Sequence, residues 1–339
     1  MKTVRVLTTI IYCRKIYSTG YKISYNQYYN CKFISMKNSF ILLAYYILFI
    51  LSNQPHVSAQ QTKKVKASFV SDSISVQEEF NRYFENKHAK GDIMVLDLQN
   101  NKWFASDAKS VFVPSLPAST FKIINLLIAL ETKVISDENQ VVKWTGHTDT
   151  VKYGYRPDIY RDMTVKEAFE KSAGWVFVEL AKKIGKKNYQ HYLSLAGYGN
   201  ADLNETDPDF WNFGNFGISP YNQLEFLRKL YLEQLSFDKR HMQTVKRVML
   251  SEEYPDYAIH AKTGWTRIDG LNIGWWVGYI EKQNNTYLFA TRLFQDRNLK
   301  NSGFGSSRKD ITRRVLEDLG FIDIPSSAKT STLTIQSRH

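Results

Sequence analysis

A helix-length segment from Pro117 to about Thr132 is apolar on nearly every side. Its apolar side chains are Phe121, Ile123, Ile124, Leu126, Leu127, Ile128 and Leu130. A helix without a polar face is buried inside a protein rather than lying on its surface. Lys122 is the only charged residue of this helix before Glu131. The pattern therefore predicts a central helix that carries one amine into the protein interior near its beginning.

Strand patterns occur at both ends of the chain. Residues 91–99 are β-rich, and within them only Asp97 interrupts the apolar run 93–98, which predicts a strand covered on both faces. The pair Asn100-Asn101 predicts a tight turn, so residues 102–106 return as the second strand of a hairpin. Further β-rich segments are predicted near the C-terminus, at residues 258–266, 271–282 and 286–294, with a turn at Asn284-Asn285.

Four segments have helical periodicity. Residues 164–184 and 222–235 lie in the middle of the chain, whereas 77–87 and 307–319 lie outside the predicted strands at its two ends. We therefore expect an α/β (α+β) fold, in which N- and C-terminal strands form one antiparallel sheet flanked by helices. The sheet lobe would comprise about 68–110 and 255–322, and a mostly helical lobe about 119–248. A functional site is expected in the cleft between them.

The N-terminus resembles a targeting segment. Lys37 precedes a twelve-residue apolar run, residues 40–51, and Val57-Ser58-Ala59 fits a cleavage site. We interpret residues 36–59 as a signal peptide and residues 60–339 as one catalytic domain, periplasmic or secreted. Residues 1–35 are interpreted as a non-native leader from a start codon assigned too far upstream. The alternative is a cytoplasmic extension before an uncleaved anchor.

The composition excludes several classes of function and of structural feature. The net charge is +12, but residues 1–59 hold seven Lys and Arg and no Asp or Glu, which leaves +5 for the remainder. No cluster suggests nucleic-acid binding, since the lysines of 182–187 are interpreted as a solvated face. The two cysteines, Cys13 and Cys31, precede the expected cleavage site, so the mature protein would lack disulfides. The seven histidines lack metal-ligand spacing, so no metal is expected.

Ser119 and Lys122 form the strongest candidate for chemistry. One helical turn separates them, so the hydroxyl and the amine share a face. A serine hydroxyl needs a neighbouring base to become a good nucleophile. Apolar surroundings lower the pKa of a lysine and allow it to act as that base. This pair, at a helix N-terminus whose free N–H groups can stabilise an oxyanion, is suited to acyl transfer.

Other segments offer partners for this pair. Lys262-Thr263-Gly264 lies in a predicted strand, where glycine permits close ligand approach and the two polar side chains can hold a carboxylate. Ser172 is a second hydroxyl able to relay protons, or an ordinary helix serine. Arg308 could reach a substrate carboxylate, or lie on the surface. Trp211, in a Gly- and Asn-rich loop, either packs or donates to a buried anion.

Together these motifs resemble the class D serine β-lactamases, over roughly residues 68–322. The segments that carry the resemblance are 117–122, Tyr198-Gly199-Asn200, Trp211, 262–264 and Gly274-Trp275-Trp276-Val277-Gly278. The resemblance implies a small-molecule β-lactam substrate, resistance to such antibiotics, and a monomer or homodimer without a membrane partner after signal cleavage.

The same resemblance implies roles for individual residues. Ser119 would be acylated, and Lys122 would carry a carbamate formed with CO2 and act as general base. Trp211 would donate to that carbamate, because an unpaired buried anion is costly. Lys262, Thr263, Gly264 and Arg308 would bind the substrate carboxylate, and the N–H groups of Ser119 and Trp265 would form the oxyanion hole.

One position departs from the family pattern. The family's second motif is usually Ser-x-Val, whereas this chain has Ser172-Ala173-Gly174. A gap is therefore expected beside the carbamate, which either stays open or is refilled by Trp175 or by water. Two alternatives share part of the pattern. A penicillin-binding transpeptidase normally has Ser-x-Asn, which is missing after Ser119. A β-lactam sensor domain resembles class D but stays acylated.

Overall fold

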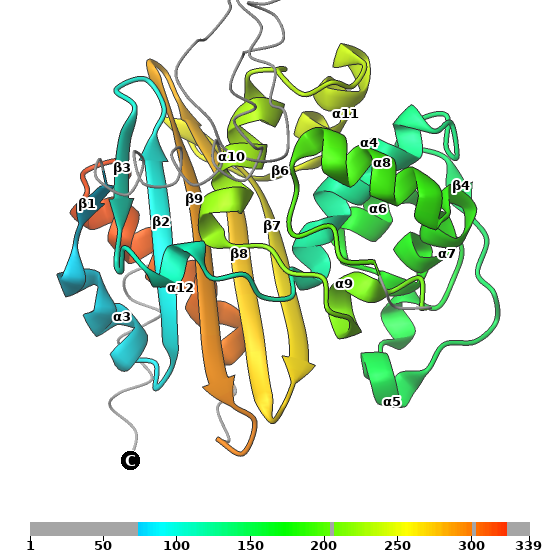
Figure 1. The fold of residues 1–339 in the computed structure, drawn as a ribbon, viewed down its shortest axis with the longest axis horizontal. Coiled ribbons are helices and arrows are strands. Elements are labelled where there is room, and N and C mark those ends of the chain that lie inside the picture. Colours follow the sequence, from blue (N-terminus) through cyan, green and yellow to red (C-terminus); the bar gives the residue numbers. More distant parts are fainter. Residues whose placement is uncertain (1–73, 204–206, 300–302, 324–339) are drawn as a thin grey trace, which may run out of the picture. The chain divides into compact units, whose positions relative to one another are not determined.

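The computed structural model describes residues 74–203, 207–299 and 303–323, which all belong to the unit formed by residues 66–339. The predicted leader, signal peptide and both cysteines lie outside the described residues. Seven strands form one sheet in the order β1-β3-β2-β9-β8-β7-β6 (Figure 1). Their bounds are Ile74–Val76 (β1), Lys102–Ala105 (β3), Lys90–Asp97 (β2), Asn285–Asp296 (β9), Leu271–Lys282 (β8), Tyr257–Ile268 (β7) and Leu250–Glu253 (β6).

The sheet joins strands from both ends of the chain, which confirms the predicted fold class. β2 pairs with β9 in antiparallel register, with Met94 opposite Ala290. β1 departs from the expected pattern because it runs parallel to β3, so the sheet is mostly rather than wholly antiparallel. The apolar run in β2 is buried on both faces, with Ile93, Met94 and Val95 at most 1 % exposed.

Helices cover both faces of the sheet. On one face, η1 (Glu78–Phe80), α3 (Asn81–Glu85) and α12 (Phe304–Asp318) bury Phe84, Trp276 and Val315 in a common core. On the other face, α10 (Pro220–Tyr231) crosses the sheet (Figure 1). The Tyr231 ring contacts the Tyr279 ring edge-on at 5.1 Å. α10 therefore lies against the strands, although its sequence falls inside the segment expected to form a helical lobe.

The helical side surrounds α4 (Lys122–Glu131), which follows the 3-10 turn η3 (Ala118–Phe121). Residues 122–130 are all buried, as the all-round apolar pattern predicted. Helix α4 is packed by α7 (Gly174–Ile184), α8 (Lys186–Ala196) and α11 (Lys239–Val248). Helix α6 (Val165–Glu170) packs on α7 and α11 in the same core. The helical pattern predicted over 164–184 is interrupted between α6 and α7, where Ser172 takes a left-handed backbone conformation with φ +57°.

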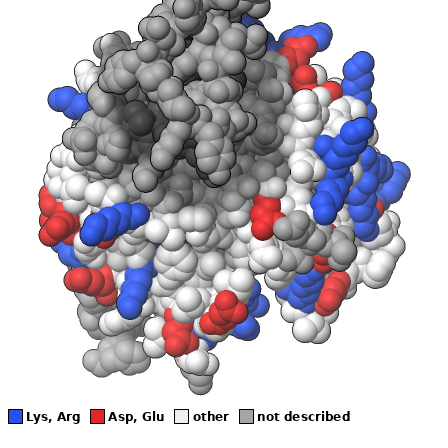
Figure 2. Space-filling model, in the orientation of Figure 1, with Lys and Arg blue, Asp and Glu red and all other residues white. Residues whose placement is uncertain are grey.

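Short elements complete the chain. They are η2 (Ser110–Phe112), β4 (Val141–Val142), α5 (Thr150–Tyr153), η4 (Pro157–Ile159), β5 (Met163–Thr164) and α9 (Phe210–Phe213). None of the helices among the described residues is long and apolar enough to cross a membrane. Figure 2 shows Lys and Arg side chains gathered at the right edge of the view, on the side where Figure 1 places α7 and α8. Lys182, Lys183, Lys186 and Lys187 are exposed there.

A buried ion pair anchors the segment that leads to Ser119. Arg292 of β9 and Asp92 of β2 lie opposite each other, with Nη2 and Oδ2 2.6 Å apart and side chains 2 % exposed. The same guanidinium donates to the carbonyl oxygens of Ser110 at 2.9 Å and Val113 at 2.6 Å. The central strands therefore hold the backbone of residues 110–113 in place.

Replacing Asp92 tests this anchor. Asp92→Asn leaves the Arg292 charge buried without a counter-charge, which should lower the free energy of unfolding by about 3–5 kcal/mol in urea titration. Lys182→Gln, which breaks an exposed pair with Glu179, is the control and should leave the unfolding midpoint unchanged. Equal effects of the two substitutions would contradict the role assigned to the buried pair.

Candidate active site

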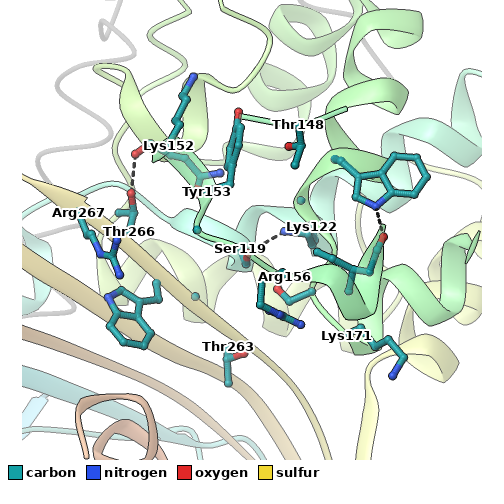
Figure 3. Close-up of a pocket in the computed structure, with 18 of the residues that line it drawn as sticks. Ser119, Lys122, Thr148, Lys152, Tyr153, Arg156, Lys171, Thr263, Thr266 and Arg267 are labelled. Carbon is teal, nitrogen blue, oxygen red and sulfur yellow. Dashed lines mark hydrogen bonds between the residues drawn. The ribbon is translucent and has the colours of Figure 1, made fainter. Parts of the chain in front are cut away.

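A cavity of about 550 Å³ opens where β7 meets the helical side of the molecule (Figure 3). Seven of the site residues predicted from the sequence line it: Ser119, Lys122, Ser172, Thr263, Gly264, Trp265 and Arg308. Residues from four distant parts of the sequence thus meet in one site, as expected for the cleft.

Ser119 and Lys122 are in direct contact. A hydrogen bond of 2.7 Å joins Lys122 Nζ and Ser119 Oγ (Figure 3). Lys122 is 1 % exposed, and its Nζ lies 5.3 Å from the centre of the Phe177 ring. Burial lowers the pKa of Lys122 to about 8, although the negative charge of Asp209 opposes this shift. The amine therefore loses its proton far more readily than an ordinary lysine and can accept one from Ser119.

The turn that presents Ser119 is fixed from several sides. Ala118 has φ +52°, a strained conformation for a residue with a side chain. Thr120 Oγ1 donates to the Pro117 carbonyl at 2.7 Å and accepts from Gln223 Nε2 of α10 at 2.9 Å. The indole of Trp275 in β8 donates to the Leu116 carbonyl at 2.9 Å. Both the sheet and α10 therefore hold the nucleophile in place.

Lys262 and Ser172 form a second amine–hydroxyl pair, with Nζ and Oγ 3.0 Å apart. Lys262 is 4 % exposed. Its pKa lies well below the ordinary value, mainly because of burial and also because the charges of Lys122 and Arg308 are near. The break between α6 and α7 turns Ser172 toward this amine. The pair can pass a proton to or from a group bound in the cavity.

Gly264 allows β7 to approach η3. Strand β6 pairs only with residues 258–260 of β7, so residues 262–266 face the helical side of the molecule. A Cβ on Gly264 would lie 2.8 Å from the Pro117 carbonyl oxygen. Arg308 Nη1 donates to the Gly264 carbonyl, and burial lowers the pKa of Arg308 to about 10. The strand predicted for Lys262-Thr263-Gly264, with glycine permitting a close approach, agrees with this geometry.

Trp211 lies behind the nucleophile rather than on the cavity wall. It is 1 % exposed and stacks on Phe121, with ring centroids 4.9 Å apart and planes at 8°. Its Nε1 is buried, and within the described ranges no hydrogen-bond acceptor reaches it. A buried unpaired donor is unusual and indicates that an acceptor is missing from the chain itself.

Gly174 leaves open space in the cavity. No described atom lies within 4 Å of the position that a Cβ on Gly174 would occupy. Trp175 does not close this opening, because its indole donates to the Ile159 carbonyl at 2.7 Å and its ring packs edge-on against Trp144. The gap expected from the sequence is therefore present.

Sequence reasoning missed several residues of the site, among them Asp209, Tyr153 and Asn212. Asp209 is fully buried, accepts from Tyr153 at 2.7 Å and from Asn212 at 2.8 Å, and burial raises its pKa to about 6. An acid directly before the aromatic pair Phe210-Trp211 was an available signal for Asp209. Nothing in the sequence indicated Tyr153, which lies 56 positions away.

The close approach at Gly264 predicts a steric cost. Gly264→Ala should lower the free energy of unfolding by about 1–3 kcal/mol, because the backbone of η3 or β7 must move. Gly305→Ala is the matched control, since its Cβ would meet only the Trp265 ring at an ordinary 3.6 Å. Urea titration of both variants is the measurement, and equal stability of the two would contradict the packing described here.

The buried amine predicts a gain in stability on its removal. Below pH 8 the folded state must hold the Lys122 charge in an apolar site, whereas the unfolded state holds it in water. Lys122→Met should therefore raise the free energy of unfolding at pH 7 by about 3 kcal/mol in CO2-free buffer. The gain should shrink as the pH rises from 8 toward the ordinary lysine value. A variant less stable than the wild type at pH 7 would contradict this prediction.

Known proteins resemble the chain over most of the described residues. A family model described as penicillin binding protein transpeptidase domain matches residues 81–317. Beta-lactamase OXA-5 of Pseudomonas aeruginosa is 34 % identical over 256 residues, which are 75 % of this chain and 92 % of that protein.

Solved structures of class D β-lactamases are also similar to this chain. The class D β-lactamase YbXI from Nostoc is 36 % identical with a TM-score of 0.66, covering 73 % of this chain and 100 % of that chain. The class D β-lactamase of Sebaldella termitidis is 35 % identical with a TM-score of 0.69, covering 74 % and 98 %. The family that the motifs indicated is thus confirmed: the chain belongs to the class D serine β-lactamases and is a hydrolase of that family.

Proposed function

We propose that the chain opens the β-lactam ring of penicillin-type antibiotics through an acyl-enzyme on Ser119, with Lys122 as the general base. The observation that carries this proposal is the 2.7 Å hydrogen bond between a cavity-lining hydroxyl and a buried amine of lowered pKa. A base this close can take the hydroxyl proton as the oxygen attacks a carbonyl carbon.

The walls of the cavity supply the binding groups. Thr263 and Arg308 line it, so a substrate carboxylate would meet a guanidinium and a hydroxyl. Lys262 would add to this site through Ser172, to which its amine is hydrogen-bonded. Gly264 brings β7 against η3, which supports an oxyanion hole formed by the N–H groups of Ser119 and Trp265. The Trp265 side chain is 43 % exposed at the mouth and offers an apolar surface to the substrate.

The steps conserve protons and bonds. Ser119 Oγ bonds to the lactam carbonyl carbon while its proton passes to Lys122. The ring C–N bond then breaks, and Ser172, paired with Lys262, delivers a proton to the ring nitrogen. Ser172 regains a proton from Lys122, which returns the amine to its neutral form. In the second half, the neutral base takes a proton from water as the water oxygen bonds to the acyl carbon. The bond between that carbon and Ser119 Oγ then breaks, and the base returns the proton to Ser119.

Carbamylation of Lys122 fits the site. CO2 reacts with a neutral amine, and the lowered pKa of Lys122 provides one. The unpaired Trp211 Nε1 offers a donor for the resulting anion. When bound, CO2 would supply an anionic base that water activation in the second half-reaction can use. Among the described residues no group of His, Cys, Asp or Glu side chains is arranged to hold a metal ion.

We also propose that the enzyme is exported to the periplasm or secreted. The support is the pattern of residues 36–59, a lysine followed by an apolar run and a small-residue cleavage site. The antibiotic acts outside the cytoplasm on the cell wall, where such an enzyme would meet it as a monomer or homodimer.

Mass spectrometry with benzylpenicillin tests the catalytic roles. The wild type should form a transient adduct on Ser119, whereas Ser119→Ala should form none. Lys122→Ala should lower turnover by about 10²–10⁴-fold, and added bicarbonate should raise turnover of the wild type only. Ser306→Ala, on the same helix as Arg308 but exposed, is the control and should behave as the wild type.

Two outcomes would overturn the proposal. A wild-type adduct that persists for hours would favour a β-lactam sensor. An adduct that forms in Ser119→Ala would place the nucleophile elsewhere.

A further inference from the structure

A second buried ionisable group lies beside Lys122. Asp209 is fully buried, and its carboxylate is near enough to Lys122 for each charge to shift the pKa of the other. It directly precedes α9, whose aromatic residues Phe210 and Trp211 pack on Phe121, the neighbour of Lys122. Helix α9 is fixed in turn to β7, since Thr266 Oγ1 donates to the Asn212 carbonyl at 2.7 Å. The position of Asp209 relative to the base is therefore built into the fold.

Asp209 is connected to the cavity through Tyr153. The Tyr153 hydroxyl donates to Asp209 Oδ2 at 2.7 Å, and the Tyr153 ring lines the cavity. Asn212 Nδ2 donates to the other carboxylate oxygen at 2.8 Å. The remaining ionisable groups around it are Lys152 of α5, paired with Asp207 at 2.6 Å, and Tyr189 of α8. Of these groups, Lys122, Lys152 and Tyr153 also line the cavity.

This arrangement creates an electrostatic problem for a modified lysine. With Lys122 protonated and Asp209 ionised, the two buried charges cancel. A carbamate on Lys122 would instead place a second anion beside Asp209 in a site of low polarity. Two carboxylates that share such a site do not both stay ionised, because the repulsion raises the pKa of one of them.

We propose that Asp209 is a positioning residue that takes up the proton released when CO2 reacts with Lys122, and that Tyr153 links this proton to the cavity. The inference rests on the proposed carbamylation. As the N–C bond to CO2 forms, one N–H bond of the neutral amine breaks and the proton moves to the Asp209 carboxylate. The buried site then holds one negative charge before and after the reaction.

The hydrogen bonds around Asp209 can accommodate this proton. Tyr153 donates its hydroxyl hydrogen while Asp209 is ionised, and its oxygen can accept from Asp209 once the acid is neutral. Asn212 still donates to the other oxygen. The Tyr153 hydroxyl hydrogen would then turn from Asp209 toward the cavity that Tyr153 lines, and the Asp209 carboxyl group keeps both of its hydrogen bonds in either state.

The number of protons released to solvent tests the proposal. At pH 8 the wild type, with Lys122 about half protonated, should release about half a proton per carbamate formed, and Asp209→Asn at least one. ¹³C-bicarbonate NMR counts carbamate carbons, and an indicator dye counts protons. The difference between the two proteins does not depend on whether CO2 or bicarbonate is added. Equal release by both would overturn the proposal.

Two further variants separate the partners. Asp207→Asn removes the neighbouring exposed carboxylate and should release protons as the wild type does. Tyr153→Phe keeps the Asp209 carboxylate and should also match the wild type. If Tyr153→Phe instead releases as many protons as Asp209→Asn, the Asp209 carboxylate alone does not take up the proton and the proposal is wrong.

Infrared spectroscopy of the wild type tests the proposal without relying on variants, which could fail to fold. Addition of CO2 should produce the carbonyl band of a neutral carboxylic acid, and its absence would contradict proton uptake by Asp209. If no carbamate carbon appears in the wild type, carbamylation itself fails, whereas the Ser119 adduct is still decided by mass spectrometry.

Discussion

The site depends on the exclusion of the Lys122 amine from solvent. Lys122 is 1 % exposed at the beginning of a helix whose sides are all buried, and this burial lowers its pKa to about 8. A charged group in such a place costs stability, and natural folds retain this cost where function needs it. The amine becomes useful because its only hydrogen bond within the described residues is to Ser119.

Other features of the fold bring groups to this amine. The glycine of β7 lets the strand approach the turn that holds Ser119, and the helical break at Ser172 turns a second hydroxyl toward the cavity. The buried pair of Asp92 and Arg292 holds the preceding backbone from the centre of the sheet. If CO2 reacts with Lys122, the negative charge of the buried site must stay constant, and under our proposal the Asp209 carboxylate keeps it constant by taking up the released proton.

Much of this arrangement could be predicted from the sequence, because the spacing of apolar residues along a short segment determines whether it forms a helix or a strand and which sides are buried. The apolar helix, the strands at both ends and the Ser119–Lys122 spacing followed from residues near one another. The parallel pairing of β1 with β3 and the packing of α10 on the sheet did not, because both depend on contacts between distant segments. Tyr153 was missed for the same reason, since 56 positions separate it from Asp209, with which it shares a hydrogen bond. Asp209 itself had a local signal, its position directly before Phe210 and Trp211, which was not used.

The central claim is that the Lys122 amine is readily deprotonated within the folded protein. An NMR titration of lysine side chains, with CO2 excluded and the signal assigned by its loss in Lys122→Met, measures this directly. The account predicts a midpoint at a pH of about 8 for Lys122. A midpoint near 10.4, the value of an ordinary solvated lysine, would contradict it.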